Sequence, residues 1–111
     1  MSTTGQNLLK GDLPIYPGAV ASEKGVSLRI FDDEGAADIL VSKFRTRDSL
    51  AQVDTWYRGK LGTEFKREEG QVFGHRREGV GFFRETAGRS RGVALQPKHG
   101  DVEIIVFRFP Q

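Results

Sequence analysis

The segment SLAQVDTWYRGKLG, residues 49–62, decides the fold because it carries the clearest helical repeat of apolar residues in the chain. Its apolar residues recur three or four positions apart, which places them on one face of an α-helix: Leu50, Val53, Tyr57 and Leu61. Trp56 flanks that face. At about 1.5 Å per residue the helix is roughly 20 Å long, enough to cross a small sheet. We therefore predict one amphipathic helix over residues 49–61, packed on a β-sheet.

The ends and the polar side of this segment support the same prediction. Thr46 or Asp48 offers a side-chain oxygen that can cap the first turn, and Gly62 suits the left-handed residue that ends a helix. Asp54 and Arg58 stand four positions apart in the favourable order for a weak ion pair. We expect both to lie on the polar side of the helix.

The residues before the helix predict a β-hairpin. Residues 26–31 alternate apolar and polar side chains, and residues 37–44 do so with a break in parity that a bulge near Ser42-Lys43 would explain. The acidic stretch 32–35, which ends in glycine, joins the two strands. Further upstream, Pro17-Gly18 has the chemistry of a type II turn.

The chain after the helix is rich in short apolar stretches separated by glycine. We expect strands at residues 64–68, 72–77, 80–85, 93–95 and 101–109. The intervening turns fall at residues 69–70, 78–79, 86–89 and 97–100. Residues 101–109 carry apolar side chains on both faces, which indicates a central strand.

These elements together predict an α+β fold. We expect a curved antiparallel sheet of about five to six strands packed on one α-helix, in the chain order ββαβββ(β). No second helix separates the strands, so parallel βαβ repetition is not expected. Residues 1–11 are polar and predict a flexible lead-in, and residues 12–111 predict a single domain.

Composition and charge exclude several kinds of site. The chain has 111 residues and no cysteine, so disulfide scaffolds, thiolate zinc sites and cysteine nucleophiles are excluded. No apolar run approaches the roughly 20 residues that a membrane-spanning helix needs. The net charge is +2, but residues 45–111 hold 13 basic and 9 acidic side chains. This excess biases the second part of the chain toward anions.

No residue pattern indicates catalysis. His75 stands beside two arginines and His99 lies in a predicted turn, and neither has a carboxylate at a spacing that requires contact. The acidic residues 32–34 lack the ligand spacing of a calcium loop, and the chain has no Gly-x-Ser-x-Gly motif. We therefore predict that the protein is not an enzyme and uses no metal or other cofactor.

A group of basic and aromatic residues is the most suggestive candidate site. Its arginines are Arg76, Arg77, Arg84, Arg89 and Arg91, and Phe73, Phe82 and Phe83 lie among them. Alternate positions on neighbouring strands project together, and arginine beside exposed aromatic rings suits single-stranded nucleic acid or another anion. The alternative is that the phenylalanines face the helix while the arginines face water. The interleaved Glu78 and Glu85 favour that alternative, and a nucleic-acid partner is accordingly not the first expectation.

Three functional hypotheses follow. The leading one is a non-enzymatic α+β module that binds a protein partner or scaffolds an assembly. Binding of an anion or single-stranded nucleic acid through the arginines is the first alternative, and a small-ligand cleft between sheet and helix near Tyr16 and Trp56 is the second. The long final strand also raises edge pairing of two copies into a dimer.

The motif LPIYPGA at residues 13–19 resembles a family of small bacterial domains of uncharacterised function. Their pattern opens with lP-x-YPGA and continues through a helix of the type D-S-x-x-x-V-x-x-WY-x-x-x-L, which residues 48–61 match. The resemblance covers residues 12–62 and implies a structural role for the motif, with no catalytic residues to transfer. Such domains often occur in secreted or envelope-anchored proteins, which implies an extracytoplasmic location. A chain complete as given would instead be cytoplasmic.

Overall fold

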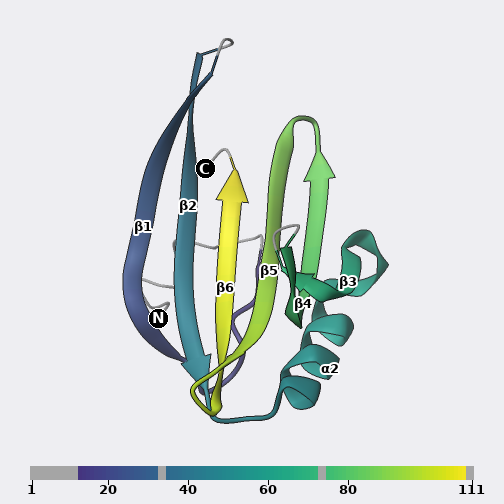
Figure 1. Ribbon diagram of the computed structural model, residues 1–111. Coiled ribbons are helices and arrows are strands. Elements are labelled where there is room, and N and C mark those ends of the chain that lie inside the picture. The colour runs from purple at the N-terminus through teal and green to yellow at the C-terminus, as the bar shows by residue number, and fades with distance from the viewer. Residues whose placement is uncertain (1–12, 33–34, 73–74, 110–111) are drawn as a thin grey trace, which may run out of the picture.

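The computed structural model describes residues 13–32, 35–72 and 75–109, without the side chains of residues 23–32, 35–39, 71–72 and 75–77. One sheet and one α-helix make up this part of the chain, as the sequence predicts (Figure 1). The elements in chain order are β1 (Val20–Asp32), β2 (Gly35–Thr46), α2 (Leu50–Leu61), the 3₁₀ turn η1 (Gly62–Glu64), β3 (Lys66–Val72), β4 (His75–Thr86), β5 (Arg89–Lys98) and β6 (Asp101–Phe109). The predicted lead-in over residues 1–11 lies outside the described residues.

The sheet has six antiparallel strands in the spatial order β1-β2-β6-β5-β4-β3. This order differs from the series of strands along the chain because β6 inserts between β2 and β5 (Figure 1). The predicted central position of residues 101–109 is thereby confirmed. Edge pairing of this final strand with a second copy is ruled out, since both of its edges are already paired. The outer strands of the sheet are β1 and β3.

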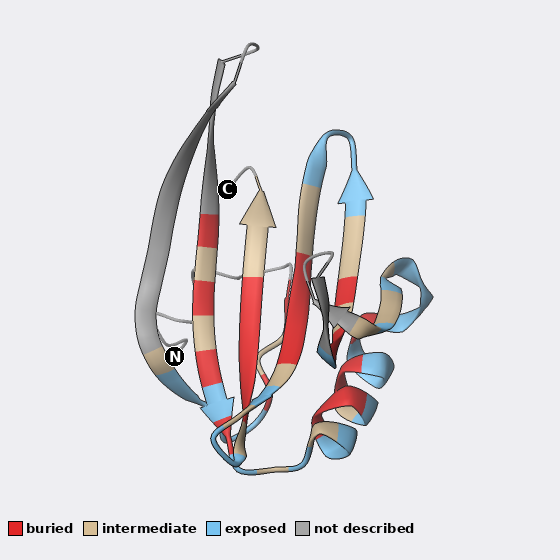
Figure 2. Cartoon of the chain, in the orientation of Figure 1, coloured by how far each residue is buried: buried red, intermediate tan, exposed pale blue. Residues whose placement is uncertain are grey.

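The main hydrophobic core lies between α2 and one face of the sheet. Val53, Tyr57 and Leu61 are buried as the helical spacing predicts, whereas Leu50 and Trp56 are half-buried at the border. Leu13 and Tyr16 come from the segment before β1, and the sheet supplies the remaining buried members of the cluster: Phe44, Val80, Phe82, Val93, Leu95, Val102, Ile104 and Val106. Figure 2 shows this burial along the middle of β5 and β6 and on one side of the helix. A smaller cluster of Val41, Ala94 and Ile105 lies on the opposite sheet face.

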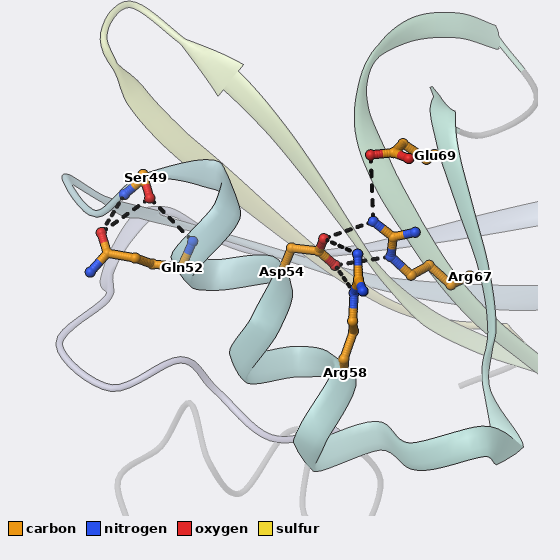
Figure 3. A network of polar contacts seen from close by, with 6 residues as sticks. All are labelled: Ser49, Gln52, Asp54, Arg58, Arg67 and Glu69. Carbon is orange, nitrogen blue, oxygen red and sulfur yellow. Dashed lines mark hydrogen bonds and ion pairs between the residues drawn. The ribbon is translucent and has the colours of Figure 1, made fainter.

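The helix begins one residue later than predicted and uses a different cap. Ser49 is the N-cap, and its Oγ accepts a hydrogen bond from the Gln52 backbone N–H at 3.1 Å. The Gln52 side chain accepts one in return from the Ser49 N–H at 3.0 Å, which completes a capping box (Figure 3). The predicted caps are occupied elsewhere: Thr46 Oγ1 accepts from the Asp48 N–H, and Asp48 accepts from Tyr16. At the other end, Gly62 has the positive φ expected of it, 69°.

Asp54 is buried at 7% exposure, contrary to the predicted position on the polar side of α2. The reason is a second partner from β3: Arg67 donates to both carboxylate oxygens, at 3.0 and 2.7 Å (Figure 3). The predicted partner Arg58 donates to the same two oxygens at 3.2 and 2.9 Å. Burial alone would raise the pKa of Asp54, but the bonds from Arg67 and Arg58 outweigh it and hold that pKa below its ordinary value.

The irregularity near Ser42-Lys43 lies on the opposite strand from the one predicted. The pairing of β2 with β6 is continuous from Leu40 to Thr46, whereas β1 shifts register between Ala21 and Val26. The parity break in β2 has a different cause, since this inner strand carries apolar residues on both faces. Two predicted turns are likewise absent: residues 69–70 lie within β3 at a register shift, and residues 78–79 lie within β4.

Three other turns form as their sequences indicate. The Tyr16 carbonyl accepts from the Ala19 N–H at 3.1 Å, and Gly18 has φ 81°, as a type II turn requires. The β4–β5 and β5–β6 hairpins close through two residues each, 87–88 and 99–100. All four residues have positive φ, which is the type I′ conformation that matches the twist of a hairpin.

Candidate functional site

Three arginines stand in one row across three neighbouring strands. Arg84 of β4 is the register partner of Arg91 in β5, and Arg91 is the partner of Arg108 in β6. We call Arg84, Arg91 and Arg108 the arginine row. Neighbouring strands lie about 4.8 Å apart, so the row spans roughly 10 Å.

The row lies on the sheet face that α2 covers, beyond the buried core. Each arginine is two positions along its strand from a buried residue of that face: Phe82, Val93 and Val106. Side chains two apart on a strand point to the same side. All three arginines are half-buried, and Figure 2 shows how burial falls off toward these ends of β4, β5 and β6. Arg89 is exposed and follows on the same face of β5.

One carboxylate reaches the row from outside the sheet. Glu64 of η1 accepts a hydrogen bond from Arg84 Nη1 at 2.7 Å, and the Glu64 side chain is 66% exposed. Like charges directly opposite one another on neighbouring strands repel, and the Glu64 carboxylate offsets part of that repulsion at Arg84. Within the row, Arg84 is therefore paired with an exposed carboxylate.

Most arginines of the predicted site come together, but its phenylalanines do not join them as a binding surface. Phe82 shares the face of Arg84, yet it is only 3% exposed, and its ring lies 6.2 Å from that of Tyr57. Phe83 is on the opposite face, where it pairs with Gly92. Phe73 and the side chains of Arg76 and Arg77 lie outside the described part.

Arg108 is not among the arginines that the sequence pattern predicts for this site. A signal for it was present, since Arg108 shares the parity of Val102, Ile104 and Val106 in the final strand. That parity predicts the same face, but only the pairing of β6 with β5 places Arg108 beside Arg91.

Tyr16 and Trp56, the predicted ligand cleft, are in contact with each other. Their ring centroids are 5.4 Å apart in an edge-to-face arrangement, and Trp56 makes a similar contact with Tyr57 at 4.9 Å. A shallow hollow of about 510 Å³ lies beside them, with Gln52 and Thr55 in its wall. The volume would suit a small ligand, but both rings already serve to attach residues 13–19 to the helix.

Two tyrosine hydroxyls strengthen that attachment. Tyr57 donates to the Pro14 carbonyl at 3.0 Å, and Tyr16 donates to Asp48 Oδ2 at 2.5 Å. Burial raises the pKa of Tyr57 far above its ordinary value. The hydrogen bond to Asp48, followed by burial, raises the pKa of Tyr16. Both hydroxyls therefore stay protonated as donors over the physiological range.

A further carboxylate is buried on the sheet face opposite α2. Glu103 of β6 is 2% exposed, and it accepts from Gln96 Nε2 at 2.8 Å and Lys98 Nζ at 3.4 Å. Burial would raise the pKa of Glu103, but Gln96 and Lys98 together lower it below its ordinary value. With its oxygens held by β5, Glu103 fastens the β5–β6 hairpin.

Within the described residues, no three His, Asp or Glu side chains gather in a way that could hold a metal ion. No described helix is long and apolar enough to cross a membrane. Comparison with known protein families, curated proteins and solved structures finds no match to this chain. The resemblance to the lP-x-YPGA domains therefore stays a prediction.

Proposed function

We propose that this domain is a binding module whose ligand is a polyanion held by Arg84, Arg91 and Arg108, with Arg89 at the end of the row. The observation that carries the proposal is the shared register of the three arginines on adjacent strands. A guanidinium group donates to phosphate or carboxylate in a bidentate manner, and a rigid sheet fixes the spacing of the donors.

The geometry favours a ligand that is held through its phosphate groups, with no bases stacked on aromatic side chains. Binding of single-stranded nucleic acid usually places bases on exposed aromatic rings. Phe82, two positions from Arg84 on the same face, is buried, and Phe83 points to the other face. A ligand with two or more phosphate groups within roughly 10 Å would reach several arginines at once.

Glu64 offers a variant that should strengthen ligand binding, whereas the arginine variants should weaken it. Its carboxylate occupies Arg84, and the bond is exposed enough for a stronger anion to displace it. Replacing Glu64 with glutamine should therefore release Arg84 to the ligand and tighten binding, whereas loss of a row arginine should weaken it.

The experiment is a titration of the purified protein with inorganic tripolyphosphate by calorimetry, at low and at moderate salt. We expect R91Q and R108Q to weaken binding about tenfold, which corresponds to one charge-assisted contact, and E64Q to tighten it severalfold. Thermal melts of each variant check that the fold survives.

The matched control is K66Q, which removes one exposed cation from the opposite sheet face. If K66Q weakens binding as much as R91Q does, the attraction is only net charge and the site is refuted. Absence of binding by the unaltered protein at low salt would also refute it.

A further inference from the structure

A groove of about 540 Å³ lies at the opposite end of the sheet from the arginine row. The Pro17-Gly18 turn and the first residues of β1 form one wall, and residues 45–48 at the end of β2 and Asp101 at the start of β6 form the other. In Figure 1 these segments meet at the base of β1, β2 and β6. The volume lies within the range of small-molecule sites.

Two cations and two anions line this groove. Arg47 is exposed and makes no ion pair within the described part of the chain. The Arg45 side chain is 43% exposed, and its Nε lies 3.8 Å from Asp101 Oδ2, which is too long for a hydrogen bond. The fourth charge is the carboxylate of Asp48. The groove thus carries two positive and two negative groups in its lining, Arg45 and Asp101 among them as a long ion pair, and has no net charge.

One acidic group of the groove, Asp48, is held in place before any ligand arrives. Asp48 accepts the Tyr16 hydroxyl at 2.5 Å, and its backbone N–H donates to Thr46 Oγ1 at 3.2 Å. Tyr16 also begins the type II turn that forms the facing wall. A site with fixed groups loses less conformational entropy on binding than one that must be ordered.

One buried polar atom in the same wall lacks a partner. Ser22 Oγ is buried and has no hydrogen bond, at the point where β1 shifts register against β2. A buried hydroxyl without a partner costs free energy. Ser22 is one of the residues that line the groove, so a ligand bound there could supply the missing bond.

From these groups we infer that the groove binds a small zwitterion of the amino-acid or dipeptide class. The ligand's carboxylate lies toward Arg45 and Arg47, and its ammonium group lies toward Asp101 and the outer oxygen of Asp48. A purely anionic ligand would meet two carboxylates, and a purely cationic one would meet two guanidinium groups, so a ligand with both charges matches the lining best. This site does not depend on the arginine row.

The test uses alanyl-alanine, its N-acetyl form and its C-terminal amide, followed by chemical-shift changes in amide NMR spectra. We expect the free dipeptide to bind with a Kd of order 1 mM and to shift the amides of residues 17–22 and 45–48. Each blocked form should bind at least about tenfold more weakly, because each leaves one pair of charges unmatched.

Two variants distinguish specific recognition of the dipeptide in the groove from attraction to the protein's overall positive charge. R47Q should weaken dipeptide binding about tenfold, while K66Q, which removes an exposed cation from the edge strand β3, should leave it unchanged. Arg47 is exposed, so the fold should survive its replacement. Equal binding of the free and blocked dipeptides, shifts outside the groove, or wild-type affinity in R47Q would each overturn the inference.

Discussion

The buried carboxylate of Asp54 offers the sharpest test of the fold. Asn replaces Asp54 at the same size but removes the charge that two guanidinium groups share. The two contacts with Arg67 join α2 to β3, which lies at the edge of the sheet. D54N should therefore loosen the link between helix and edge strand while leaving the apolar core intact.

The two arginines do not contribute equally to the expected loss. The Arg58 side chain is 55% exposed, so this pair within the helix contributes only about 0.3–0.5 kcal/mol. Arg67 is 25% exposed, and its two charge-assisted bonds should contribute about 2 kcal/mol together. We expect D54N to lower the free energy of unfolding by about 2–3 kcal/mol, or the melting temperature by roughly 10 °C.

Urea unfolding at several pH values is the measurement. Because the folded pKa of Asp54 lies below its unfolded value of about 3.9, the charge stabilises the fold above pH 4, and the benefit is lost as pH falls through the folded pKa. The difference between wild type and D54N should be constant from pH 7 to 5 and shrink below about pH 4.

A double-mutant cycle identifies the partner. R67M combined with D54N should show a coupling of at least about 1 kcal/mol, and R58M with D54N a few tenths. A D54N variant as stable as wild type at pH 7, or one whose deficit persists unchanged at pH 2, would show that the contact to Arg67 does not stabilise the fold.

Two further predictions concern packing. G92A should destabilise the domain by at least about 2 kcal/mol, because the added Cβ would lie 2.1 Å from the Phe82 carbonyl oxygen. G59A, in open space on α2, should instead stabilise the domain by roughly 0.5–1 kcal/mol. Equal effects of the two variants in thermal melts would contradict the described strand packing. Y57F removes the bond to the Pro14 carbonyl and should cost about 1 kcal/mol in urea unfolding with the ring packing preserved, whereas no change would mean that this bond does not hold residues 13–19.

The features that the sequence predicts correctly depend on local patterns. The spacing of Val53, Tyr57 and Leu61 is a property of one helix, and it sets the buried face regardless of what covers it. Apolar residues on both faces of residues 101–109 require neighbours on both sides, so the central position of β6 follows. The Pro17-Gly18 turn likewise depends on the φ preferences of its own two residues.

The features that depend on strand register, or on a charge far away in the sequence, follow only from the tertiary structure. Asp54 has the spacing of an outer helical position, and it is buried because Arg67, thirteen residues later, returns on β3 to meet it. The arginine row exists because two hairpins bring residues 84, 91 and 108 level with one another, and a shift of one residue in either would send part of the row to the other face. Local propensity carries no information about which distant segment becomes a neighbour, because that choice depends on the packing of the whole sheet.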